Sequence, residues 1–229
     1  LAAEAEPDFA TLAAELRRDQ ERYGAASHHR LVDAFKLPAL WVLAGAYFVS
    51  QVGVYIVNLW MPLTLDSFSR GVADASLMAR YSTIPYLAAA AMTVVVGWSS
   101  DRRNERRWHI AGCLTLSAVG FAWAATAHSM PVALCAMTLA AVGLWSMMGP
   151  FWTLTTSMVG GTAAAGAVAI LQVIGGGGGF TGAYMTGRLR DATHSFAGGL
   201  FVMSGMAVCA AMLALAVRRT KVVPVKVGS

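Results

Sequence analysis

The sequence predicts an all-α, polytopic membrane protein with six transmembrane helices. Of its 229 residues, 57% are hydrophobic and only 13% are charged, and the mean hydropathy is +0.57. A soluble domain carries about 25% charged residues, and a bilayer about 30 Å thick needs roughly 20 apolar residues for each helical crossing. The composition excludes a disordered chain and a disulfide-stapled module. The small net charge of +5 gives no reason to expect a nucleic-acid partner.

The crossings follow from the uncharged stretches of the chain. The stretches 37–65 and 81–100 each predict one helix, and 192–217 predicts another. The longest stretch, 110–187, has room for three, with turn signals around His128 to Pro131 and Gly160 to Thr162. A soluble protein with wholly buried helices is the disfavoured alternative. The predicted helices are 38–65, 80–98, 110–127, 130–157, 162–187 and 196–217.

Basic residues are distributed unequally over the two sides that six crossings define. The side with both termini holds thirteen Arg and Lys residues, and the opposite side holds four: Arg70, Arg80, Arg188 and Arg190. Loops rich in Arg and Lys stay in the cytoplasm. We therefore expect an integral protein of the bacterial inner (plasma) membrane with both termini in the cytoplasm.

Three parts are expected along the chain: a polar segment 1–36, a six-helix domain 37–217 and a basic tail 218–229. The first segment mixes acidic and basic residues and lacks the apolar run of a signal peptide. Its residues 9–18 suggest an amphipathic surface helix within a solvated linker. The chain begins at Leu1 and has no methionine before Met61, which suggests a processed start or a piece of a longer protein.

The loop between the second and third predicted helices carries a recognisable motif. It reads Gly-Trp-Ser-Ser-Asp-Arg-Arg-Asn-Glu-Arg-Arg-Trp-His over residues 97–109. It resembles the cytoplasmic loop signature of the major facilitator superfamily, in the version found in its anion:cation symporters. The resemblance implies a gate at the cytoplasmic side, with an acidic group paired to arginines. The implied gate residues are Gly97, Asp101, Arg102, Arg106 and Arg107.

A second segment, 149–184, resembles the same symporter family. A Gly-Pro-Phe-Trp corner precedes Gly-Thr-Ala-Ala-Ala-Gly, and a glycine-rich helix follows it. In that helix Gln172 and Gly176 stand where the family has asparagines, and Ala183 stands where it has a proline. Loss of the asparagine at Gly176 departs from the usual polar contact of the family.

The resemblance covers only the second six-helix half of a twelve-helix family. It implies that residues 1–36 correspond to the central loop between the halves, and that the partner of this chain is an N-terminal six-helix half. Family members import organic acids such as aromatic carboxylates and sugar acids. We therefore expect a small organic anion, carried with protons by alternating access, with the charged groups in the other half. The alternatives are an inert truncated membrane protein and a half-size protein that requires a partner half.

Candidate contacts for the substrate are uncharged. Tyr47, Gln51, Tyr55 and Asn58 recur at spacings of four, four and three on the first predicted helix, which places them on one face. Such groups can hydrogen-bond a carboxylate or a hydroxyl, and they can equally serve packing between helices. Gln172 is the candidate contact from the fifth helix.

Backbone irregularities mark the fourth and fifth helices. Gly149 and Pro150 predict a kink beside Trp152, a candidate wall of the substrate cavity. A run of five glycines suggests close helix packing and a hinge for alternating access. Its members are Gly175, Gly176, Gly177, Gly178 and Gly179.

Catalytic and metal-binding constellations are not expected. The five histidines lack Cys, Asp or Glu partners at metal-ligand spacing. The three cysteines lie in apolar runs, which predicts small buried side chains instead of disulfides. The sequence therefore predicts no enzyme, no cofactor and no metal.

Overall fold

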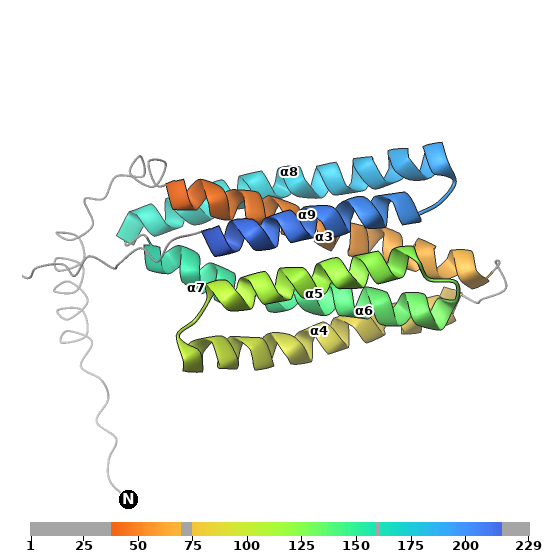
Figure 1. Ribbon diagram of the computed structural model, residues 1–229, viewed down its shortest axis with the longest axis horizontal. Helices are drawn as coiled ribbons and strands as arrows, with labels where there is room; N and C mark the ends of the chain where they lie inside the picture. Colours follow the sequence, from red (N-terminus) through yellow and green to blue (C-terminus); the bar gives the residue numbers. More distant parts are fainter. Residues whose placement is uncertain (1–37, 70–74, 159–160, 217–229) are drawn as a thin grey trace, which may run out of the picture.

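The computed structural model describes residues 38–69, 75–158 and 161–216. Over these residues the structure consists of helices, and the bar of Figure 1 locates them along the chain. The helices are α3 (Pro38–Ser69), α4 (Ala75–Arg103), α5 (Arg107–Ala125), α6 (Met130–Ser146), α7 (Met148–Met158), α8 (Gly161–Thr193) and α9 (Ala197–Ala216). The predicted surface helix at 9–18 and the basic tail lie outside the described residues.

Six segments are long and apolar enough to cross a membrane, which confirms the predicted fold class. They are Pro38–Leu63, Arg80–Arg103, Arg107–Ala125, Met130–Met158, Ala164–Thr193 and Ala197–Ala216. Helices α4 and α8 extend farther than predicted, through Arg103 and Thr193, because a helix does not have to end where its apolar stretch ends.

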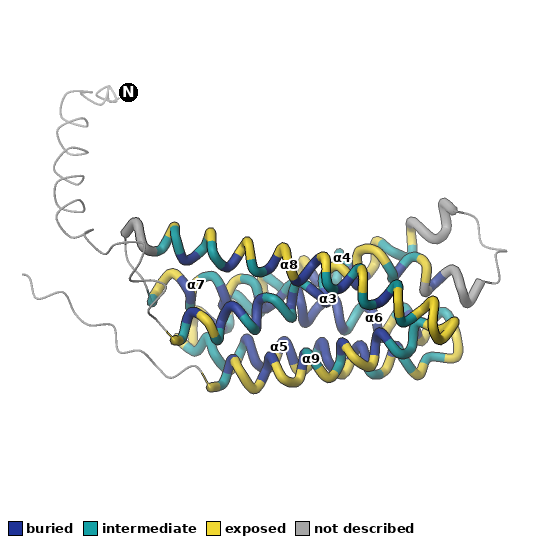
Figure 2. The backbone as a smooth tube through the Cα atoms, turned by 90° about the horizontal axis from the view of Figure 1, so that it is seen from above, coloured by how far each residue is buried: buried dark blue, intermediate teal, exposed yellow. Residues whose placement is uncertain are grey.

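The helices form two layers. Helices α5 and α9 pack against one another and cover one side of a second layer, which runs in the order α8, α3, α6 with α7, and α4 (Figures 1 and 2). The other side of this second layer is left uncovered in the described part of the chain. Only 11% of the apolar segment of α4 and 28% of that of α8 is buried, against 61% for α3. We call the uncovered side of the second layer the open face.

The fourth crossing is divided into two helices, α6 and α7. The break lies at Met147, two residues before Gly149 and three before Pro150. Proline has no N–H to donate to the carbonyl four residues earlier, and its ring crowds that carbonyl. For Pro150 this carbonyl belongs to Ser146, the last residue of α6, which explains why the helix breaks there.

Small residues bring α5 and α6 into close contact. A Cβ on Gly120 would lie 2.4 Å from the backbone nitrogen of Ala140, and one on Gly143 would lie 2.4 Å from the carbonyl oxygen of Cys113. Cys113 is buried here, as predicted, but Cys135 and Cys209 are exposed on the protein surface, so that prediction was wrong for them. An apolar side chain in a membrane helix can face lipid as well as the protein core, which composition alone cannot separate.

Candidate functional site

The four polar residues that share one face of α3 become more exposed from Tyr47 to Asn58. Tyr47 is 4% exposed, Gln51 is half-buried, and Tyr55 is 40% exposed, while Asn58 is exposed. These side chains do not form one continuous polar surface. The structure instead joins the first and the last of them to different helices, in two separate clusters.

The first cluster joins α3, α7 and α8. The Tyr47 hydroxyl donates a hydrogen bond of 2.6 Å to Oε1 of Gln172, which is exposed. The Tyr47 ring stacks on Phe151 with centroids 5.1 Å apart, and Trp152 meets it nearly edge-on at 5.2 Å. The phenol is therefore held by two aromatic side chains of α7, and its hydroxyl fixes the amide of Gln172. We call this the Gln172 cluster.

The second cluster joins α3, α4 and α6. The Tyr86 hydroxyl donates a hydrogen bond of 2.8 Å to Oδ1 of Asn58. The Tyr86 ring meets Trp145 edge-on, with centroids 5.5 Å apart and planes at 88°. We call this the Asn58 cluster. Sequence reasoning did not select Tyr86, because a stripe on one helix gives no information about which residue of another helix faces it.

The glycine run of α8 makes room for α3 and its phenols. A Cβ on Gly175 would lie 2.4 Å from Cε1 of Tyr47, and one on Gly179 would lie 2.5 Å from Cε2 of Tyr55. Gly178 faces the carbonyl oxygen of Phe48, where a Cβ would approach to 2.4 Å. These three glycines therefore allow α8 to lie directly against the site residues of α3.

The other two glycines of the run face away from this contact. A Cβ on Gly176 would meet nothing within 4 Å, and one on Gly177 would only reach Cε2 of Phe48 at 3.9 Å. Gly149, beside the helix break, also has open space around it. Helix α8 is continuous through the whole run.

The turn between α4 and α5 has a defined backbone geometry. Asn104 has a φ of 49°, the left-handed conformation common just after a helix, for which asparagine and glycine are suited. Its N–H donates to the carbonyl of Asp101 at 3.2 Å, and the N–H of Glu105 donates to that of Ser100 at 3.3 Å. This pair of bonds is the Schellman arrangement that closes a helix C-terminus. It fixes the backbone that carries Asp101 and Arg106.

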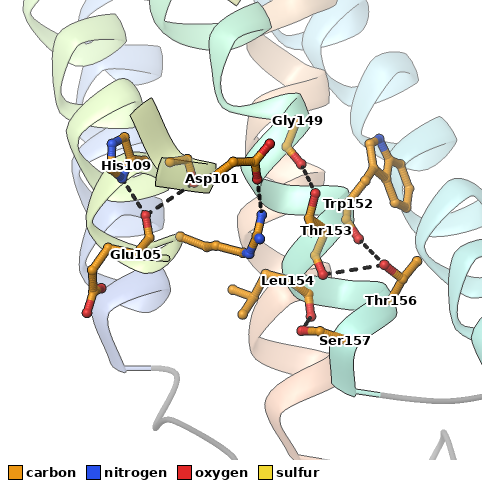
Figure 3. A network of polar contacts seen from close by, with 11 residues as sticks. Asp101, Glu105, His109, Gly149, Trp152, Thr153, Leu154, Thr156 and Ser157 are labelled. Atoms are coloured by element: carbon orange, nitrogen blue, oxygen red, sulfur yellow. Dashed lines mark hydrogen bonds and ion pairs between the residues drawn. The ribbon is translucent and has the colours of Figure 1, made fainter. Parts of the chain in front are cut away.

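The arginines of this turn have different partners. Arg106 forms an ion pair of 2.9 Å with Asp101, whose side chain is 69% exposed (Figure 3). Arg107 instead donates a hydrogen bond of 2.8 Å to the carbonyl oxygen of Leu215 near the end of α9. Arg102 lies over the ring of Trp98, and Gly97 has open space around its Cα. Of the candidate gate residues, the structure thus brings Asp101 and Arg106 together.

Helix α7 lies beside this turn and contacts both α4 and α5. Its hydroxyl side chains bond to the backbone of their own helix, as Figure 3 shows for Thr153, Thr156 and Ser157. Such local bonds satisfy hydroxyl donors in an apolar environment. On the other side of the turn, His109 contacts Ser99 and the carbonyl of Glu105. Among the described residues, no group of three His, Cys, Asp or Glu side chains is placed to hold a metal.

The six apolar helices and the two uncharged polar clusters define the class of protein: an integral, polytopic membrane protein with hydrogen-bonding groups between its helices. Residues 9–183 match the sequence profile of the Major Facilitator Superfamily. The chain therefore belongs to this family, whose members are transporters and not enzymes.

Known relatives and a solved structure agree with this family. A protein of Agrobacterium vitis named "Putative tartrate transporter" is 34% identical over 217 residues, which cover 92% of this chain and 49% of the relative. The "Quinolone resistance transporter" of Acinetobacter baumannii is 29% identical, over 83% of this chain and 43% of that protein. The chain thus spans about half the length of the curated relatives it matches.

The fold is similar to that of a bacterial homologue of the human lysosomal transporter Spinster, crystallised in an inward-facing and unoccupied conformation. The TM-score is 0.52 at 19% identity, over 81% of this chain and 48% of the other. At this identity the similarity concerns the fold.

Proposed function

We propose that this chain is the C-terminal domain of a secondary transporter that moves a small organic anion together with protons by alternating access. The observation that carries the proposal is the pair of phenol–amide hydrogen bonds at Tyr47–Gln172 and Tyr86–Asn58. The relative named as a tartrate transporter supports a carboxylate as the substrate class. Tartrate is accordingly the first compound to test.

The chemistry of the clusters suits an anion. Each phenol donates to the oxygen of an amide, so the amide NH2 group retains two N–H donors for another partner. A carboxylate accepts hydrogen bonds only, so it matches such donors. Gln172 and Asn58 are exposed. The proposed contacts, which the anion would meet in turn along its path, are Tyr47, Gln51, Tyr55, Asn58, Trp152 and Gln172.

The open face supports a partner domain. Helices α4 and α8 are the least buried apolar segments, and they lie at opposite edges of the second layer (Figure 1). We propose that an N-terminal six-helix half covers this face and supplies the charged groups for proton coupling. Residues 1–36 would be the cytoplasmic linker between the halves, 37–217 the transmembrane domain and 218–229 a cytoplasmic tail. The excess of basic residues on the side of the termini supports an orientation with both ends in the cytoplasm, in the bacterial inner membrane.

The α4–α5 turn is proposed to act at the cytoplasmic gate. Asp101 and Arg106 form an ion pair at a turn held by Asn104, and α7 lies alongside. Rocking of the domain would change the surroundings of this exposed pair. Glycines on α8 that contact α3 keep the Gln172 cluster together during such a motion, because the two helices touch along their backbones.

Uptake by proteoliposomes tests the function. The complete gene product is reconstituted, and labelled tartrate is supplied with an acidified exterior. We expect an inward proton gradient to stimulate uptake and unlabelled carboxylates to compete with it. A neutral sugar or a quinolone should have no effect on uptake. Uptake indifferent to the gradient refutes proton symport, and preference for the sugar or the quinolone refutes the anion assignment. Uptake by this 229-residue chain alone would refute the need for a partner half.

A pair of variants tests the Gln172 cluster. Gln172→Ala removes the amide that Tyr47 fixes, and we expect weaker uptake at an unchanged level of expressed protein. Val173→Ala, at the neighbouring position on α8, is the matched control because Val173 is 78% exposed and lies outside both clusters. Equal uptake kinetics of the two variants would remove Gln172 from the substrate site.

A further inference from the structure

The Asn58 cluster has hydrogen-bonding capacity that its own contacts do not use. Oδ1 of Asn58 accepts from Tyr86, which leaves the two amide N–H groups of Asn58 as donors. The phenol oxygen of Tyr86 retains the capacity to accept a hydrogen bond. Trp145 fixes the orientation of the Tyr86 ring by its edge-on contact. A carboxylate on the amide and a neighbouring hydroxyl on the phenol oxygen would use both capacities.

This cluster lies too far from the Gln172 cluster for one small substrate to contact both. Tyr47 and Asn58 are the members of the two clusters on α3, and they are eleven residues apart. A helix rises 1.5 Å per residue, so the clusters are separated by about 16 Å along α3. A four-carbon diacid is no longer than about two extended peptide units, roughly 7 Å.

The two clusters also differ in their depth within the bundle. Asn58 lies five residues before Leu63, where the first membrane segment ends, and Tyr86 lies six residues after Arg80, where the second begins. At 1.5 Å per residue both are within about 9 Å of that end of the bundle. This end is opposite the α4–α5 turn (Figure 1). The Gln172 cluster lies closer to the α4–α5 turn, since Tyr47 is nine residues from Pro38.

We propose that Asn58, Tyr86 and Trp145 form an entry site, which takes a hydroxycarboxylate arriving from the side opposite the α4–α5 turn before it reaches the Gln172 cluster. Tyr86 holds the Asn58 amide with its donors outward and also accepts a hydrogen bond from the substrate hydroxyl. This inference rests on the proposed function and on the proposed orientation, in which the entry site faces the exterior.

The test compares the two directions of transport. Uptake of labelled tartrate by the complete gene product is measured in right-side-out and in inside-out membrane vesicles. Asn58→Ala and Tyr86→Phe are expected to raise KM about tenfold, the effect of one hydrogen bond to a charged group, for entry from the exterior only. Gln172→Ala should raise KM in both directions. The double variant of Asn58 and Tyr86 should raise KM more than Asn58→Ala alone, because Tyr86→Phe also removes the oxygen that accepts from the substrate hydroxyl. Tyr81→Phe, which removes another phenol hydroxyl of α4, is the matched control.

The outcomes separate the two proposals. Equal changes of KM in both directions, or a purely lower maximal rate, would mean that Tyr86 and Asn58 only support the fold, and would overturn the entry site. A double variant with the same KM as Asn58→Ala alone would overturn the direct contact of Tyr86 with the substrate. Absence of tartrate uptake by the unsubstituted protein would overturn the proposed function, and the entry site with it.

Discussion

The contact between α3 and α8 predicts that alanine will have different effects on stability at two glycines of α8 that are two residues apart. Gly178 faces the backbone of Phe48, whereas Gly176 faces open space. Alanine adds the same methyl group at both positions and has the higher helix propensity by up to about 1 kcal/mol. The two substitutions therefore differ mainly in what the methyl group meets.

The magnitude follows from the distances at Gly178. A new Cβ would lie 2.4 Å from the carbonyl oxygen of Phe48 and 3.2 Å from its carbonyl carbon. A carbon–oxygen contact is comfortable at about 3.3 Å or more, so the overlap is about 1 Å. The obstacle is backbone and cannot rotate away, so α8 must move outward. A gap of this size forfeits about a quarter to a half of each lost dispersion contact, and overpacking costs about 1–3 kcal/mol.

We expect Gly178→Ala to lower the free energy of unfolding by about 2 kcal/mol and Gly176→Ala to leave it unchanged or raise it slightly. Unfolding of the purified complete protein in mixed detergent micelles, followed by circular dichroism over increasing sodium dodecyl sulfate, measures both. Equal stability of the two variants, or a loss at Gly176 alone, would refute the packing of α8 on α3 described above.

Three further predictions concern the turns. Asn104→Gly should leave the free energy of unfolding unchanged in the same assay. Asn104→Val should lower it by about 1–2 kcal/mol, because a β-branched residue is strained at a positive φ of 49°. Equal effects of the two substitutions would contradict the turn geometry. Pro150→Ala should supply a backbone N–H that donates to the Ser146 carbonyl, so this new N–H should be protected from hydrogen exchange. If the bend serves transport, the substitution should also slow uptake. Rapid exchange of the new N–H would contradict proline as the cause of the break. Asp101→Asn should change stability by less than about 1 kcal/mol, because the Asp101 side chain of the ion pair is 69% exposed. It should slow uptake by more than this loss of stability accounts for, and a large loss of stability with unchanged uptake would contradict the gate role.

The sequence predicted the helices better than it predicted their contacts. Apolar length and charge locate a crossing because the bilayer requires both, and each of the six crossings is present. The break lies at Met147, three residues before Pro150, because the effect of the proline falls on a carbonyl one turn earlier. That offset can be read from a sequence if the hydrogen bond is traced backward.

Contacts between helices require knowledge of which faces meet. The stripe on α3 was visible as a spacing, but its partners Tyr86 and Gln172 lie on α4 and α8, and no periodicity within α3 specifies them. In the same way, five consecutive glycines look equivalent in the sequence, while the structure separates Gly178 from Gly176 by the face each presents. The left-handed conformation of Asn104 could have been predicted from the sequence, because an asparagine directly after a basic helix end is typical of a left-handed helix cap.

The uncharged membrane segments have an electrical consequence. Residues 38–65, 81–100 and 110–187 contain no Asp, Glu, Lys or Arg. Moving one elementary charge through 100 mV changes the free energy by about 2.3 kcal/mol, and a segment without charge contributes no such term. Movement of these segments across the membrane would therefore contribute no voltage-dependent free energy from charged side chains. If the chain transports an anion with protons as proposed, substitutions among the neutral residues of α3 and α8 should alter rates without altering the charge moved per cycle.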